Sequence, residues 1–146
     1  MPTTPPTTVK SIFFGCIDYR LATIDTEFIT AHGNAFRPTF AGGGRALLDP
    51  IDRPAALHQI MAAYQLSRVT NVYIESHLDC GAYKLAGATF ASHADEVAKL
   101  YADIDEASAY VREALETAGA SPEDITIEPR VIDLFGNLME RAGERA

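Results

Sequence analysis

The sequence has little of what would place it in several broad classes of protein. Only two of its 146 residues are cysteines, too few for a disulfide scaffold and compatible with a reducing cytoplasm. Lysine and arginine total 12 against 20 aspartates and glutamates, and this net charge of −8 leaves no basic face for nucleic acid or for an anionic membrane. The best apolar run, residues 12–17, is much shorter than the roughly 18–20 residues that a membrane span needs. These absences favour a cytoplasmic protein whose partner is neither nucleic acid nor a membrane.

The composition does contain enough apolar side chains for one core. Hydrophobic residues make up 47% of the chain and charged residues 22%, as expected for one globular domain at this length. We expect a single α/β domain over residues 9–146, preceded by a disordered tail of threonine and proline over residues 1–8. The charged residues 138–146 are expected to fray.

Strand patterns alternate with helix patterns along the chain. Short runs rich in β-branched and aromatic residues predict strands, and apolar residues three and four apart predict helices. The predicted strands are residues 9–17, 37–41, 69–75 and 125–134, and the predicted helices are residues 23–32, a helix that begins at Pro54, and residues 95–117. This order implies a mainly parallel sheet of about four strands with helices on both faces. Pro129 predicts an edge position or a bulge for the last strand.

The helix predicted over residues 95–117 carries most of the negative charge. It has seven acidic residues against two basic ones, which accounts for −5 of the total charge. A solvated helix face explains these charges better than a metal site or a partner site does.

Both cysteines follow predicted strands. Cys16 comes at the end of the first strand and Cys80 just after the third, with His77 three residues earlier on the same loop. Because parallel strands end at one edge of a sheet, these three side chains can converge. Two thiolates and a neutral imidazole suit zinc and leave a fourth tetrahedral position for water or another ligand. The sequence therefore predicts a zinc site of the open, catalytic type.

Asp18 and Arg20 follow Cys16 at two-residue intervals. If the backbone stays extended, the three side chains point to one side, and the carboxylate and guanidinium can form a charge-assisted pair beside the metal. Zinc held by two thiolates is a weaker Lewis acid than zinc held by three imidazoles, so a bound water needs help to ionise and to stay oriented. We predict that Asp18 and Arg20 are catalytic residues that give this help.

Two segments resemble the zinc motifs of the β-class carbonic anhydrases: Gly-Cys-Ile-Asp-Tyr-Arg at residues 15–20 and His-Leu-Asp-Cys-Gly-Ala at residues 77–82. The resemblance extends from about residue 11 to residue 87, with a weaker match at residues 132–136. It implies that Cys16, His77 and Cys80 hold zinc and that Asp18 and Arg20 form the catalytic dyad.

The family hydrates carbon dioxide reversibly to bicarbonate and a proton, by a zinc-bound hydroxide that the dyad orients. The resemblance implies the same activity here, in a homodimer or higher homo-oligomer, since the subunits of the family's dimer share the active-site cleft. In some members the aspartate itself binds zinc in an inactive state, and Asp18 is the matching residue.

The chain departs from the family at one segment. Residues 39–43 read Thr-Phe-Ala-Gly-Gly, where members commonly carry an Arg-Asn-Ala-Gly type of segment. Related enzymes on the same scaffold hydrolyse carbonyl sulfide or carbon disulfide, and the motifs do not separate these substrates. A non-catalytic, zinc-stabilised binding protein is a further alternative. A redox pair of Cys16 and Cys80 is disfavoured because there is no Cys-x-x-Cys and His77 would have no role.

The triple glycine at residues 42–44 is not a phosphate-binding loop. It lacks the Lys-Ser/Thr of a P-loop and the spacing of a dinucleotide fingerprint. We expect a tight turn that lets the backbone approach the metal cleft. Phe40 and Tyr83 either line an apolar pocket for an uncharged gas or pack in the core.

Overall fold

The computed structural model describes residues 9–141, so the predicted N-terminal tail and residues 142–146 lie outside the described residues. Within that range, four parallel strands form one sheet in the order β2-β1-β3-β4. The strands are β1 (Ser11–Cys16), β2 (Thr39–Phe40), β3 (Asn71–His77) and β4 (Thr126–Ile132), and the helices are α1 (Ala22–Ala31), α2 (Arg53–Ser67), α3 (Gly81–Leu85) and α4 (His93–Thr117). Short 3-10 turns are η1 (Tyr19–Leu21), η2 (Gly43–Leu47) and η3 (Pro122–Asp124). The predicted α/β class and parallel sheet are confirmed.

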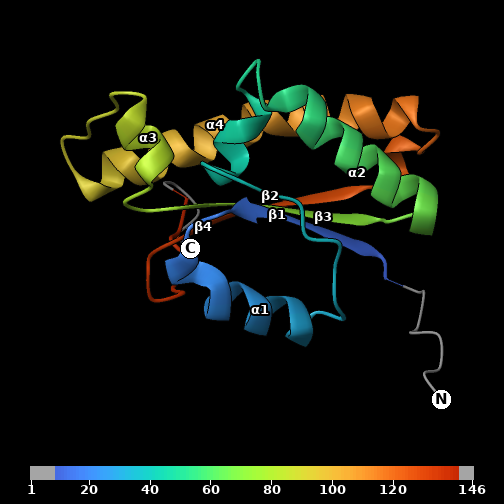
Figure 1. The fold of residues 1–146 in the computed structure, drawn as a ribbon, viewed down its shortest axis with the longest axis horizontal. Coiled ribbons are helices and arrows are strands. Elements are labelled where there is room, and N and C mark those ends of the chain that lie inside the picture. The colour runs from blue at the N-terminus through green and yellow to red at the C-terminus, as the bar shows by residue number, and fades with distance from the viewer. Residues whose placement is uncertain (1–8, 142–146) are drawn as a thin grey trace.

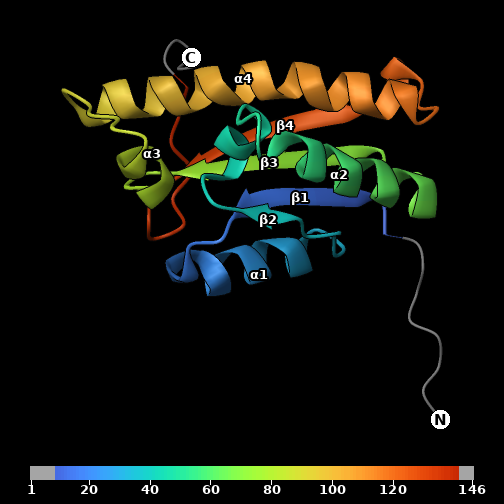
Figure 2. The same ribbon diagram turned by 45° about the horizontal axis from the view of Figure 1, so that its top comes forward.

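Helices cover both faces of the sheet, as predicted. Helix α1 lies on one face, and α2 and α4 lie together on the other (Figures 1 and 2). Helix α3 was not predicted, and a loop of three residues, 78–80, joins it to the end of β3. Over residues 9–141, no helix combines the length and the apolar character needed to cross a membrane.

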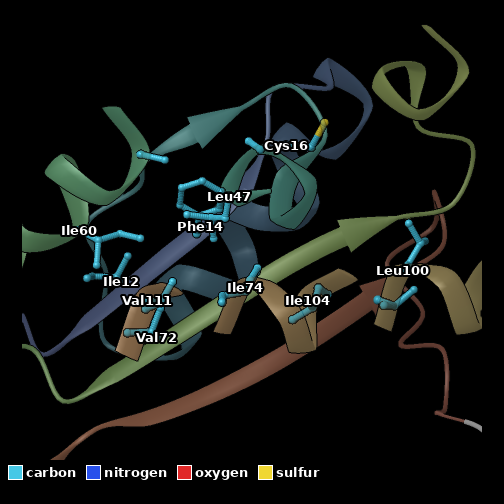
Figure 3. Packing of buried hydrophobic residues seen from close by; sticks show 14 of the residues in the cluster. Ile12, Phe14, Cys16, Leu47, Ile60, Val72, Ile74, Leu100, Ile104 and Val111 are labelled. Carbon is cyan, nitrogen blue, oxygen red and sulfur yellow. The ribbon is translucent and has the colours of Figure 1, made fainter. Parts of the chain in front are cut away.

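The main core lies between the sheet and the pair α2 and α4. Side chains alternate along a strand, so Ile12 and Phe14 of β1 share a face with Val72 and Ile74 of β3 (Figure 3). All four are fully buried and belong to one cluster, to which α4 adds Ile104 and Val111 and α2 adds Ile60. This packing fixes the sheet against the two long helices.

The face under α1 contains a smaller apolar cluster and two buried carboxyl groups. Phe13, Ile29 and Tyr73 form the cluster. Beside it, Asp25 of α1 and Glu75 of β3 are almost completely buried. Burial raises the pKa of both groups, that of Glu75 to about 9, so the pair keeps a proton at neutral pH.

The outermost strand, β4, carries Pro129. This residue lies opposite Ile74 in the parallel pairing of β3 and β4, and β4 has a strand on one side only. Proline has no N–H to donate to a strand on the other side of β4. The strand order therefore confirms the edge position predicted for the last strand.

The triple glycine forms a turn that packs against the ends of β1 and β3. Gly43 has φ +56°, and a Cβ atom built there would overlap the carbonyl oxygen of Glu75. The N–H of Gly44 donates to the Ser76 hydroxyl at 3.2 Å, and the N–H of Gly42 donates to Cys16 Sγ at 3.4 Å. The turn thus brings a backbone N–H group to Cys16, one of the three predicted zinc ligands.

We predict that Gly43→Ala lowers the free energy of unfolding by about 2–4 kcal/mol, since the new methyl group adds an overlap to a left-handed backbone. Gly33→Ala is the matched control. Gly33 also has a positive φ, +84°, but nothing lies within 4 Å of the position its Cβ would take. Urea unfolding of both variants measures the difference, and equal losses would contradict the tight packing at Gly43.

Candidate metal centre

Cys16, His77 and Cys80 converge at the C-terminal edge of the sheet. The register of β1 against β3 pairs Phe14 with Ile74, so both strands end at the same edge. One ligand atom from each of the three residues lies within 4.8 Å of the other two, and all three residues are buried. The two sulfur atoms are 4.0 Å apart. The predicted convergence is therefore present, although His77 ends β3 instead of lying on the loop, because β3 pairs with β4 as far as Ile132.

The His77 ring presents one unpaired nitrogen to this cluster. Its Nδ1 lies 2.7 Å from the carbonyl oxygen of Leu78, which fixes a tautomer with the proton on Nδ1. Nε2 is buried and has no hydrogen-bond partner in the described part of the chain. A buried unpaired nitrogen is costly, and a metal ion would satisfy it.

The two thiols are hydrogen-bonded to each other. A hydrogen bond from Cys80 lowers the pKa of Cys16 to about 4, and the same contact raises the pKa of Cys80. Burial works against a charged His77, but its contacts with Cys16 and the Leu78 carbonyl raise its pKa overall. A divalent ion bound here would lower the pKa of both thiols and displace their protons. Two sulfurs and one imidazole form a donor set that fits a borderline-soft metal ion.

Asp18 and Arg20 form the predicted pair, but not through an extended backbone. The chain turns into η1 at Tyr19, because the Asp18 carboxylate caps this turn by accepting the N–H of Arg20 at 2.9 Å. The turn brings the guanidinium back onto the carboxylate, with Nη2 donating to Oδ2 at 2.7 Å and Nε to Oδ1 at 3.0 Å. These bonds lower the pKa of Asp18 to about 2. Oδ2 of Asp18 also lies 3.6 Å from Nε2 of His77, so the pair stands beside the cluster.

Arg20 also reaches the loop between His77 and Cys80. Its Nη1 donates to Oδ2 of Asp79 and its Nη2 to the Asp79 carbonyl oxygen, both at 3.1 Å. Lys84 of α3 forms an ion pair with the same carboxylate. Sequence reasoning missed Asp79, although a charged residue between two candidate ligands was the available signal.

Two acidic residues of α4 contact the segment that contains Cys80. Glu96 Oε2 accepts the N–H of Asp79 at 2.9 Å. Asp103 is buried and accepts the Tyr83 hydroxyl at 2.6 Å, which attaches α3 to α4. The interpretation of this acidic side as a solvated face is therefore wrong at these two positions. The sequence pattern gives the charges on a helix, but not the loop that packs against it.

A small cavity of about 230 Å³ opens beside Cys16. Asp18 is the charged residue in its wall; the other lining residues are Cys16, Ile17, Ala41, Gly42, Gly81, Ala82 and Leu85. Phe40 instead stacks on Phe14 with ring centroids 5.5 Å apart, so it packs in the core. Tyr83 is buried and does not line this cavity either.

Comparison with known proteins gives a likeness in structure alone. No family model and no curated protein matches the sequence. The carbonic anhydrase of Streptococcus mutans superposes with a TM-score of 0.53 at 21% identity, covering 95% of this chain and 86% of the other. The apo form of a carbon disulfide hydrolase gives 0.54 at 16% identity, with coverages of 94% and 81%.

Two tetrameric β-carbonic anhydrases of Sordaria macrospora give a TM-score of 0.55 at 14% identity, covering 94% of this chain and 82% of the other. Identities this low establish the architecture and leave the activity open. The chain therefore has the fold of the β-carbonic anhydrases.

Proposed function

We propose that the protein is a zinc-dependent enzyme that reversibly hydrates carbon dioxide to bicarbonate and a proton. The observation that carries this proposal is the meeting of three groups at one sheet edge: the Cys16–His77–Cys80 cluster, the Asp18–Arg20 pair and an apolar cavity. The fold supports it, because it is the fold of the β-carbonic anhydrases.

Cys16, His77 and Cys80 would hold the zinc ion. Zinc supplies a Lewis acid that makes hydroxide available from water near neutral pH. The free, buried thiols suit this role in the reducing cytoplasm, where we expect the protein to work.

Asp18 orients the attacking oxygen in this proposal. Its pKa of about 2 keeps the carboxylate ionised at physiological pH, so it accepts hydrogen bonds and does not give a proton away. Arg20 fixes the direction of the carboxylate by bonding to both of its oxygens. A closed state with Asp18 as fourth ligand, as in some members of the family, would require the carboxylate to give up bonds to Arg20.

The cavity wall suits small, uncharged, linear substrates. Ala41, Ala82 and Leu85 offer methyl groups and no hydrogen bonds to such a molecule. Carbonyl sulfide and carbon disulfide are also small, linear and uncharged. The structural likeness to a carbon disulfide hydrolase favours their hydrolysis as the second candidate function.

We further propose that the chain forms a homodimer or a higher homo-oligomer. Large apolar side chains stand exposed near the cavity, with Ile17 63% exposed and Leu85 93% exposed. Exposed apolar groups of this size are typical of surfaces that another protein covers. Similar structures include tetramers, which supports a second copy of the chain as the partner.

We expect the purified protein to bind one zinc ion per chain. Cys16→Ser and His77→Ala each remove a ligand and should reduce the zinc content to well below one per chain, as measured by elemental analysis after dialysis. His58→Ala, at an exposed position of α2, is the control and should keep full zinc content. A wild-type protein that binds no zinc would contradict the proposed site.

We expect the zinc-loaded protein to hydrate carbon dioxide in a stopped-flow assay between pH 7 and 9. Asp18→Asn keeps the shape of the side chain but loses the ionised acceptor, so kcat should fall by about 10²–10³-fold, as for other lost orienting contacts. Asp124→Asn, at an exposed position in η3, should not change kcat. Sulfide release from carbonyl sulfide or carbon disulfide without carbon dioxide hydration would favour the second candidate, and inactivity towards all three gases would favour a non-catalytic zinc protein.

Leu85→Glu should shift the protein towards the monomer in sedimentation equilibrium, because a charge at the proposed interface would be buried without a partner. Leu66→Glu makes the same change at another exposed leucine, 78% exposed on α2, and should leave the assembly intact. A monomeric wild-type protein at micromolar concentration would contradict the proposed assembly.

A further inference from the structure

The turn between the candidate ligands His77 and Cys80 depends on one residue in a strained conformation. Asp79 has φ +58°, in the left-handed region that residues other than glycine rarely occupy. This conformation sets how far Cys80 lies from the end of β3. This backbone conformation is unfavourable for residues other than glycine, so contacts with its neighbours must hold it.

The side-chain contacts of Asp79 supply part of this restraint. Arg20 and Lys84 both pair with its carboxylate. That carboxylate is 47% exposed and the Lys84 side chain is 64% exposed, so solvent weakens these ion pairs.

The backbone amide of Asp79 has a partner on α4. It donates at 2.9 Å to the carboxylate of Glu96, and hydrogen bonds to a carboxylate are stronger than those between neutral groups. Glu96 lies in the first turn of α4, which Ser92 caps by accepting the N–H of Asp95. The acceptor therefore projects from a fixed helix end.

The residues on either side of Asp79 are held by other elements. The N–H of Leu78 donates to the Ile132 carbonyl oxygen at the end of β4, at 2.9 Å, and the Cys80 carbonyl oxygen accepts the N–H of Lys84, at 3.2 Å. The loop itself borders a cavity of about 690 Å³, which Glu96 also lines. On that side the bond from Asp79 to Glu96 is the polar contact that joins the loop to α4.

We propose that Glu96 is a positioning residue of the metal centre: its carboxylate fixes the left-handed turn at Asp79 and thereby the placement of Cys80 relative to His77. The proposal rests on the proposed function in that it requires these residues to bind a metal ion. Removing the carboxylate would free the turn to relax, because water in the cavity could take the amide hydrogen bond. The apolar core does not include Glu96, so the fold would persist.

The test compares three variants by zinc affinity, measured in competition with a chelator, and by the absorption spectrum of the cobalt-substituted protein. Glu96→Ala should weaken zinc binding by about 10–100-fold and change the cobalt spectrum, as losses of groups that orient metal ligands do. Glu96→Gln keeps an oxygen acceptor and should restore most of the affinity. Asp95→Ala removes the same charge from the same helix turn at an exposed position and should stay within twofold of wild type.

Urea unfolding of the metal-free variants separates positioning from a general loss of stability. A positioning role requires that Glu96→Ala lose zinc affinity although its free energy of unfolding is close to that of Asp95→Ala. Unchanged zinc affinity and an unchanged cobalt spectrum in Glu96→Ala would overturn the proposal. An equal loss of zinc affinity in Asp95→Ala would also overturn it, and so would a failure of Glu96→Gln to restore the affinity. A wild-type protein that binds neither zinc nor cobalt would overturn the proposed function as well. Failure of the proposed function is therefore seen in the wild-type protein, and failure of the Glu96 proposal is seen in the variants.

Discussion

Parallel pairing of β1 with β3 is the constraint on which the site depends. Two neighbouring parallel strands must end at the same edge, and these two end in Cys16 and His77. The sheet can run parallel only because α1, α2 and α4 carry the chain back between successive strands. The glycine turn then closes against the same edge, where its backbone reaches the Cys16 sulfur. The candidate metal centre is thus a consequence of strand order, and no local motif builds it alone.

Much of the fold and the centre of the site follow from the sequence. Local signals were sufficient here: residue composition for the four strands, apolar spacing for the three long helices, and the missing N–H of Pro129 for the edge position of the last strand. The convergence of Cys16, His77 and Cys80 followed from one topological rule. The pairing of Asp18 with Arg20 was predicted, but the route was wrong because a capped turn, and not an extended strand, brings them together.

What the sequence could not provide are contacts between distant segments. Helix α3 is five residues long, too short for periodicity to reveal, and the bond between Tyr83 and Asp103 attaches it to α4. Glu96 looks like any other acidic residue on a helix until the loop at Asp79 is placed against it. Asp25 and Glu75 carry no local sign that they are buried side by side. Each of these depends on which elements pack together, and a linear pattern does not record that.

The 64 positions between Cys16 and Cys80 also bear on how the protein is made. In zinc fingers the ligands are close in sequence, so a short peptide can capture its metal as it folds. Here Cys16 leaves the ribosome several seconds before Cys80, at about 5–20 residues per second. Metal capture must await a contact of high sequence separation, and such contacts form slowly. The nascent chain therefore passes through an interval in which Cys16 has emerged and Cys80 has not, and a metal ion held by both thiols could bind only after that interval.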